Sequence, residues 1–216
     1  MTERQSVDDL LIAHAAGKLP EPVGLAVATH LALNPAARAR YRRYEAFGGV
    51  LLDELEPEGL APDAWARMEA LLDAESEGAP EPDQRVATTD QRVPRPLRDY
   101  LPGPIKSLRW RFYGPAAEIE LPIKVPGYRT SLIRVRAGRH VPQHTHEGNE
   151  LTVVLEGAFR DETGHYGRGD LMIADSSLDH RPWADEAQDC VCLVVTDAPL
   201  RFTGRFGRFL NPFIRF

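Results

Sequence analysis

The stretch that decides the fold is GRHVPQHTHEGNELTVVLEG, residues 138–157. His144 and His146 stand two residues apart, so in an extended strand both imidazoles project from the same face and can reach one ion. Gly148 allows the backbone to turn before Glu150 returns a carboxylate at the start of a second strand. The stretch therefore predicts two short strands that build a metal site between them.

A third imidazole follows at the end of the segment from Gly169 to His180. Three histidines and one carboxylate offer nitrogen and oxygen ligands, which suit borderline divalent metals. A lone histidine in a strand is usually a packed polar residue, but four ligands at these spacings are hard to obtain by chance. We expect one divalent ion, zinc first, with iron, manganese or nickel as alternatives. The expected ligands are His144, His146, Glu150 and His180.

Beyond Leu97 the hydrophobic pattern has a period of two. The runs SLIRVRAG, ELTVVLEGAF, DLMIA and DCVCLVVTD are short, rich in β-branched residues and separated by glycine or proline. Many short strands of this kind are typical of an antiparallel barrel or sandwich. The phenylalanine-rich end of the chain, residues 201–216, is expected to dock as a strand.

The N-terminal part has helical periodicity instead. Ser6 can cap a first helix that ends near Gly17, and Asn34 with Pro35 separates a second helix from a third. A fourth helix, from about residue 62, places Trp65, Met68 and Leu72 on one stripe. The fold class is therefore α+β in two domains. We expect a helical domain at residues 1–74, a polar, proline-rich flexible linker at 75–98, and a β domain at 99–216.

Composition narrows the classes of function. The formal net charge is −6 and 43% of the residues are apolar. An acidic balance argues against direct binding to nucleic acid, no stretch is long and apolar enough for a membrane span, and the polar N-terminus lacks a secretory signature. A cytoplasmic location is expected, and the two cysteines form no disulfide framework.

The chain resembles the ChrR-type anti-sigma factors. Residues 138–157 have the spacing of the first cupin motif, and the second motif follows with Asp175 and Ser177 in place of the usual proline and glycine. The run beginning GAFRDETGHYGRGD at Gly157 is similar to the cupin domain of that family. LLIAHAAGKL and VATHLAL, near the N-terminus, are similar to its anti-sigma domain.

This resemblance implies a two-domain regulator. A helical domain would sequester an extracytoplasmic-function sigma factor, and a jelly-roll cupin domain would sense singlet oxygen or organic peroxide. Members of the family bind zinc in both domains, and their cupin ligands correspond to His144, His146, Glu150 and His180. The sigma factor is the expected partner, and a homodimer is left open.

The N-terminal zinc motif of the family, His-x3-Cys-x2-Cys, does not carry over. His30 remains, but Asn34 and Ala37 stand where the cysteines belong, and Gln5 and Ser6 occupy the region of an early histidine. An imidazole without thiolates cannot hold structural zinc. We expect a zinc-free helical domain held by its own core, with His14 and His30 as packing residues.

Cys190 and Cys192 share one face of a predicted strand. Their Cα atoms would lie about 6.5–7 Å apart, at the upper edge of disulfide geometry. They are either small buried apolar residues or, as the family resemblance favours, redox-sensing thiols near the metal.

Two other functions stay open. The same ligand shell supports iron(II) dioxygenases and metal-dependent isomerases of the cupin class, for which Tyr166, Asp175 and Arg181 are candidate acids or bases. Alternatively, the helical domain mediates dimerisation alone. His140 and His165 are not expected to be ligands.

Overall fold

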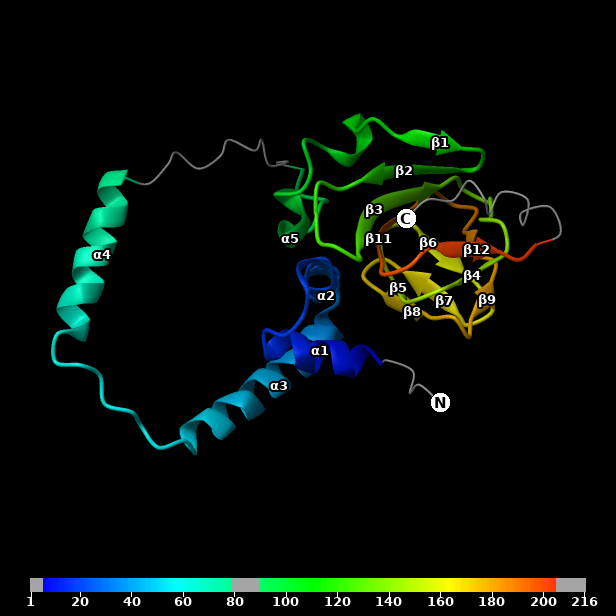
Figure 1. Cartoon of the computed structure of the whole chain (residues 1–216). Helices are drawn as coiled ribbons and strands as arrows, with labels where there is room; N and C mark the ends of the chain where they lie inside the picture. The colour runs from blue at the N-terminus through cyan, green and yellow to red at the C-terminus, as the bar shows by residue number, and fades with distance from the viewer. Residues whose placement is uncertain (1–5, 79–89, 205–216) are drawn as a thin grey trace.

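In a computed structural model of this chain, residues 6–78 and 90–204 are described. Helices come first and antiparallel strands follow (Figure 1), so the predicted fold class is confirmed. The described helices are α1 (Val7–Ala15), α2 (Glu21–Leu33), α3 (Pro35–Asp53), α4 (Ala64–Gly78) and the short α5 (Arg95–Arg98), with a 3-10 turn at Ile105–Ser107.

Side-chain caps fix two of the helix boundaries at the predicted residues. The Ser6 hydroxyl accepts a hydrogen bond from the Asp9 backbone N–H at 3.2 Å, and the Asp9 carboxylate accepts one from the Ser6 N–H at 2.8 Å. This reciprocal pair satisfies donors that the first helical turn leaves free. At the α2–α3 corner, the Asn34 side chain accepts from the Ala37 N–H at 3.0 Å.

The strands pair antiparallel in three described sheets. They are β1 (Arg111–Tyr113), β2 (Ala116–Glu120), β3 (Arg129–Val135), β4 (His144–His146), β5 (Glu150–Glu156), β6 (Ala158–Arg160), β7 (His165–Gly167), β8 (Leu171–Ala174), β9 (Asp179–His180), β10 (Trp183–Ala184), β11 (Cys190–Thr196) and β12 (Leu200–Phe202). The large sheet has the order β1-β2-β3-β11-β5-β8, and the two smaller ones are β10-β6-β7 and β12-β4-β9. Of the tail expected to dock as a strand, β12 pairs with β4, and residues 205–216 lie outside the described residues.

The large sheet is apolar on both faces. On β11, Leu193 and Val195 belong to one buried cluster, while Cys192 and Val194 belong to another. This division follows from the alternation of side chains along a strand. The sheet therefore separates a helix-covered face from a face inside the β domain.

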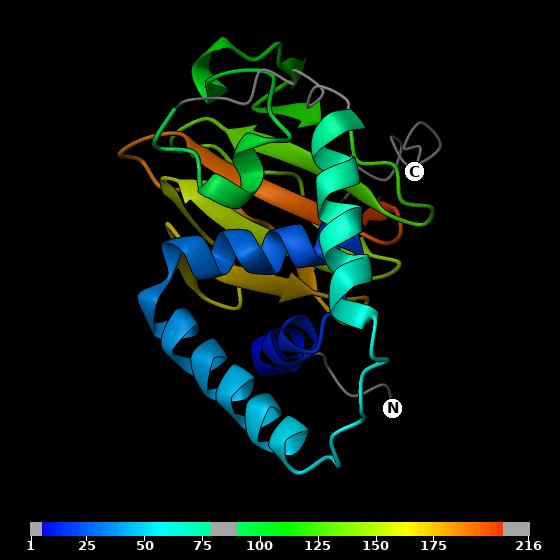
Figure 2. The same cartoon turned by 90° about the vertical axis from the view of Figure 1, so that its left-hand side faces the viewer.

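The helix-covered face and the N-terminal helices form one core. The cluster that contains Leu193 also contains Leu11 of α1 and Val27 of α2, and α2 contacts β5 and β11. Figure 2 shows α2 lying across the large sheet. The expectation that the helical domain is held by its own core is therefore wrong. The reason is that α2 carries buried residues around most of its circumference, and such a helix needs partners on more than one side.

The segment expected to be a linker, residues 75–98, has three parts. Residues 75–78 continue α4, and residues 79–89 lie outside the described residues. Val93 and Leu97 are fully buried in the shared core, because α5 packs against α2. The last part is thus packed, and where the two domains divide stays a prediction.

The end of α3 and all of α4 differ from the other helices. The helix α4 stands apart from the sheets (Figure 1). The predicted stripe of Trp65, Met68 and Leu72 is 75%, 53% and 60% exposed. These side chains therefore form no part of the core.

Candidate metal centre

Two paired strands bring the three predicted histidines together. His144 and His146 lie on β4, and His180 on β9 stands opposite His144 in the antiparallel register. Their exposures are 4%, 3% and 0%. One nitrogen from each imidazole lies within 4.8 Å of the others, so this buried group can hold a metal ion.

The nitrogen atoms that converge are the Nε2 atoms. The Nε2 of His180 lies 3.1 Å from that of His146 and 3.2 Å from that of His144. Two nitrogen ligands on a tetrahedral ion, each about 2.0–2.1 Å from the metal, lie about 3.3 Å apart. The spacing of these atoms therefore fits shared coordination.

Hydrogen bonds on the opposite ring edges decide which nitrogens carry protons. His144 Nδ1 lies 2.8 Å from the Pro142 carbonyl, which can only accept, so Nδ1 is the protonated nitrogen. His180 Nδ1 lies 2.8 Å from the Asp161 carboxylate. In the neutral rings, both Nε2 atoms then present lone pairs to each other, an arrangement that a cation stabilises and a hydrogen bond cannot.

The protonation state also suits metal binding. The pKa of His144 and of His146 is lowered to about 4, mainly by burial and in part by the neighbouring His180. Burial alone would raise the pKa of Asp161, but hydrogen bonds from His180 and Thr163 outweigh it and lower that pKa below its usual value. At neutral pH His144 and His146 are therefore uncharged, and the Asp161 carboxyl group is ionised.

The fourth predicted ligand, Glu150, lies beside the group of histidines but outside it. Its Oε2 is 3.7 Å from His146 Nδ1, and its Oε1 accepts a hydrogen bond from the Thr152 hydroxyl at 3.0 Å. Glu150 is 8% exposed and begins β5 on the metal-facing side. The structure thus brings three of the four predicted residues into one cluster and keeps the carboxylate next to it.

Sequence reasoning missed Asp161, the carboxylate behind His180. It lies in the turn between β6 and β7, and the side chains of Asp161 and His180 are both 0% exposed. No local pattern marks an acidic residue in a polar turn as buried. The signal exists only once β9 is placed against this turn.

Of the residues considered for catalysis, Asp175 acts electrostatically on His146, whereas Tyr166 and Arg181 contact other side chains. Tyr166 stacks on Phe159 and shares a hydrogen bond with Thr163, while the Arg181 side chain contacts the His140 ring. Asp175 accepts hydrogen bonds from the backbone and hydroxyl of Ser177.

Cys190 and Cys192 are buried on the metal-facing side of β11, with their sulfur atoms 3.6 Å apart. A hydrogen bond with Cys190 and burial raise the pKa of the Cys192 thiol well above its usual value. Since the thiolate is the reactive form, the raised pKa disfavours reaction at the Cys192 thiol.

The positions of the N-terminal zinc motif have other partners. His30 is 4% exposed, and its Nδ1 donates to the Gly169 carbonyl at 2.7 Å across the helix–sheet interface. Asn34 and Ala37 form the cap of α3. Arg38 donates to the carbonyls of Leu31 and Ala32 at the end of α2. Hydrogen bonds therefore hold the α2–α3 corner.

The remaining histidines lie away from the metal centre. His14 packs against Tyr41, with ring centroids 5.5 Å apart, and His165 contacts Asp185 at 2.8 Å near the surface. Neither belongs to the group that can hold an ion.

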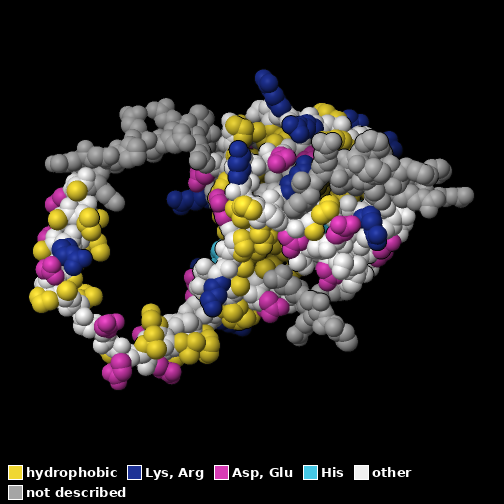
Figure 3. Space-filling model, viewed as in Figure 1, with side chains coloured by type: hydrophobic (Ala, Val, Ile, Leu, Met, Phe, Trp, Pro, Cys, Tyr) yellow, Lys and Arg dark blue, Asp and Glu magenta, His cyan; other side chains and the backbone are white. Residues whose placement is uncertain are grey.

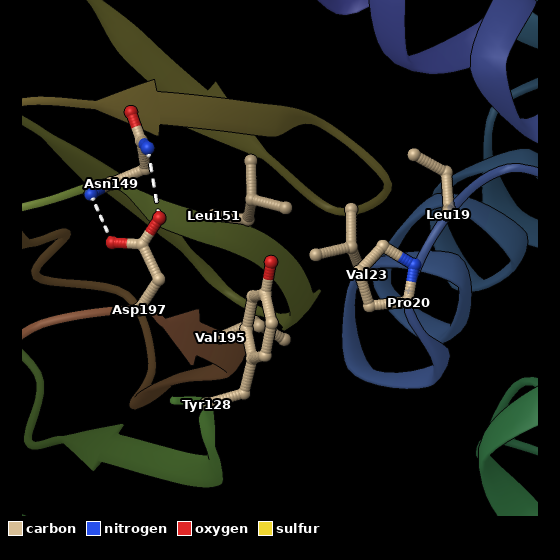
Figure 4. A pocket seen from close by; sticks show the side chains of 8 residues that line it. All are labelled: Leu19, Pro20, Val23, Tyr128, Asn149, Leu151, Val195 and Asp197. Atoms are coloured by element: carbon tan, nitrogen blue, oxygen red, sulfur yellow. Dashed lines mark hydrogen bonds between the residues drawn. The ribbon is translucent and has the colours of Figure 1, made fainter. Parts of the chain in front are cut away.

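A small cavity of about 230 Å³ lies where the α1–α2 turn meets the large sheet (Figure 4). Asn149 and Asp197 close one side through two hydrogen bonds of 2.6 and 2.8 Å. The lining residues are Leu19, Pro20, Val23, Tyr128, Asn149, Leu151, Val195 and Asp197. Leu151 faces this cavity while its neighbour Glu150 faces the metal centre, so β5 touches both sides of the sheet.

No described helix combines the length and apolar composition that crossing a bilayer requires.

Comparison with known proteins places these features in a family. Residues 106–199 match the family described as ChrR Cupin-like domain. The chain is 42% identical over 216 residues, all of both chains, to the anti-sigma-E factor ChrR of Cereibacter sphaeroides. The crystal structure of Rhodobacter sphaeroides SigE in complex with the anti-sigma ChrR matches with 40% identity and a TM-score of 0.75, covering 90% of this chain and 98% of that one.

Proposed function

This chain belongs to the ChrR family of anti-sigma factors, and we propose that it sequesters an extracytoplasmic-function sigma factor through α3 and α4. The observation that carries the proposal is the apolar surface of these two helices. In this proposal the cupin domain holds one divalent ion and relays an oxidative signal to the helices.

Ten large apolar side chains between residues 47 and 72 are at least half exposed. They lie on the end of α3, on the segment that connects α3 to α4, and on α4 (Figure 3). They are Phe47, Val50, Leu51, Leu52, Leu55, Leu60, Trp65, Met68, Leu71 and Leu72. We call this set the α3–α4 apolar surface.

An apolar surface of this extent is typical of a protein interface, because removing apolar side chains from water is favourable. Amphipathic helices bind partners by placing such a face in a groove. The relative of known structure was crystallised with SigE, and its likeness to this chain supports a sigma factor as the occupant. The acidic net charge leaves direct binding to nucleic acid unsupported.

Binding of the full chain to candidate extracytoplasmic-function sigma factors tests this proposal. A Trp65→Asp, Met68→Asp double variant should weaken the Kd by about 30-fold or more, as expected for central interface residues. Phe112→Asp is the matched control, because Phe112 is 62% exposed on β1, far along the chain from these helices. Equal affinities for the two variants would refute the assignment of the surface.

For the metal we propose one divalent ion, zinc first, held by the Nε2 atoms of His144, His146 and His180, with Glu150 as fourth ligand. The facing lone pairs of His144 and His180 support this, because a cation between them would stabilise that arrangement. Iron, manganese and nickel fit the same donors. When bound, the ion would supply a link between β4, β9 and β5.

Metal analysis of the purified chain tests the assignment. We expect about one ion per chain, lost in a His144→Ala, His146→Ala double variant and retained in His165→Ala, whose imidazole is exposed. Two ions per chain would contradict a zinc-free helical domain, in which His30 is engaged with Gly169.

For oxidant sensing we propose that Cys190 and Cys192 react after the metal centre loosens. An organic hydroperoxide would take two electrons and two protons from the thiols, giving a disulfide, the alcohol and water. The sulfur atoms stand 3.6 Å apart and must approach to about 2.05 Å, so β11 has to distort. The strand β11 belongs to the large sheet, and the opposite face of this sheet packs against α2. A distortion of β11 can therefore reach the helices.

Thiol labelling after peroxide treatment tests this order of events. The metal-free chain should form the disulfide faster than the metal-loaded chain, and a Cys190→Ser variant should form none. Equal rates with and without metal would refute a protective role for the ion.

The proposal also includes a division into domains, a location and an oligomeric state. A helical region at 1–74 and a cupin region at 99–216 remain our proposed division. A sigma factor acts in the cytoplasm, so we infer the same location for this chain. A homodimer is also open, and sedimentation of the free chain distinguishes one copy from two.

A further inference from the structure

The buried pair of His180 and Asp161 differs from the contacts of the other two histidines. His144 Nδ1 donates to a neutral carbonyl, and His146 Nδ1 has no hydrogen-bond partner among the described residues. His180 Nδ1 contacts a carboxylate at 2.8 Å, with both side chains at 0% exposure. His180 is therefore the imidazole that its surroundings orient most strongly.

The turn between β6 and β7 orients the Asp161 carboxylate in advance. Its Oδ1 accepts hydrogen bonds from the Thr163 backbone at 2.8 Å, the Thr163 hydroxyl at 2.6 Å and the Gly164 N–H at 3.2 Å. The Asp161 N–H donates to the Gly164 carbonyl at 3.0 Å. With Oδ1 occupied by these donors, Oδ2 is left for His180.

This arrangement selects one tautomer of His180. An ionised carboxylate only accepts hydrogen bonds, so Nδ1 must carry the proton and Nε2 must carry the lone pair. Nε2 is the atom that faces His144 and His146. The opposite tautomer would place a lone pair against the carboxylate and a hydrogen among the converging nitrogens.

We propose that Asp161 is a positioning residue for the metal centre, which holds His180 with its Nε2 lone pair directed at the ion. The inference rests on the proposed metal binding and adds a role for a residue outside the ligand set. Removing a carboxylate behind a ligating histidine typically weakens metal affinity by about 10- to 100-fold.

Asp161→Asn is the informative substitution, because it preserves size but offers only one accepting oxygen. If that oxygen keeps the bonds from Thr163 and Gly164, the amide NH2 faces His180 and donates to Nδ1. The proton of His180 then moves to Nε2, on the metal side. A residue with a purely structural role would not reverse this tautomer.

Asp185→Asn is the matched control, since the Asp185 carboxylate makes the same 2.8 Å contact with the exposed His165. Thr163→Val is a milder second variant. Because Thr163 is exposed, we expect the chain with this substitution to fold normally. It removes one hydrogen bond to Oδ1 and should weaken metal affinity by about threefold.

The experiment has two readouts on the full chain. Nitrogen chemical shifts of the metal-free protein report the tautomer of His180, and competition with a chelator gives the Kd for zinc. We expect the Nδ1–H tautomer in the wild type and in Asp185→Asn, and the Nε2–H tautomer with a Kd raised about 10- to 100-fold in Asp161→Asn.

The outcomes separate this inference from the proposal on which it rests. Wild-type zinc affinity and an unchanged tautomer in Asp161→Asn would overturn the role of Asp161 alone. A wild-type chain that binds no metal would overturn the metal centre and the inference with it.

Discussion

Gly169→Ala should destabilise the contact between α2 and the large sheet. Gly169 has φ +90°, and its carbonyl accepts the hydrogen bond from His30. A Cβ added there would lie 3.0 Å from the Leu33 Cβ and 3.2 Å from the Leu33 carbonyl oxygen. The substitution therefore adds backbone strain and a steric clash at the end of α2.

The expected loss can be estimated from these two effects. A non-glycine residue at positive φ costs about 1–2 kcal/mol, and an extra methyl group in a packed contact costs about 1–3 kcal/mol. We expect the free energy of unfolding to fall by about 2–5 kcal/mol in urea titrations followed by circular dichroism. Hydrogen exchange should become faster in α2.

Gly127→Ala is the matched control, with φ +79° and no atom within 4 Å of the added Cβ. It carries the strain without the clash, so it should cost only about 1–2 kcal/mol. The difference between the two variants measures the contact with Leu33. If both variants lose the same stability, the end of α2 does not pack against the turn at Gly169, and the assignment of a shared core is wrong.

Three further predictions concern the caps, the core and pH. Asn34→Ala should lower the free energy of unfolding by about 1 kcal/mol in urea titrations, because the first turn of α3 loses its cap. Leu193→Ala should cost about 2–5 kcal/mol and shift the helical and sheet signals together, whereas separate midpoints would argue against one core. In the metal-free chain, the pKa of His144 and of His146 is about 4 when folded and 6.5 when unfolded, so the unfolded state binds more protons between these values. Stability should be complete above pH 6.5 and fall by about 3 kcal/mol per histidine as the pH drops to about 4, and a flat profile between pH 7 and 4.5 would refute this.

Sequence reasoning reached the elements whose signals are local. The cap at Ser6, the break at Asn34 and the alternation of His144 with His146 each depend on neighbours within a few residues. Because caps and strand alternation are set by backbone geometry, they could be read without knowing the rest of the chain. The helices, the antiparallel strands and the placement of His144 and His146 on one strand face followed from these signals. His180 lies 34 residues beyond His146 and was joined to them by the chemistry of the ligand set and the family resemblance.

The shared core could not be read in the same way. The pattern of α2 shows that it is apolar on most sides, but not which surface covers it. The covering face is made by β5 and β11, more than a hundred residues farther along the chain. The same applies to Val93 and Leu97, which lie in a polar, proline-rich stretch and are buried only because α5 meets α2.

The sequence by itself determined the kinds of elements, the placement of His144 and His146 on one strand face and the absence of the N-terminal thiolates, since each is a matter of residue type and short spacing. Only the tertiary structure decided which partners these groups meet. It set His30 against the Gly169 carbonyl, and it buried Asp161 behind His180. The physical reason is that hydrogen bonds and burial depend on which distant segments pack together, and a local pattern does not specify that packing.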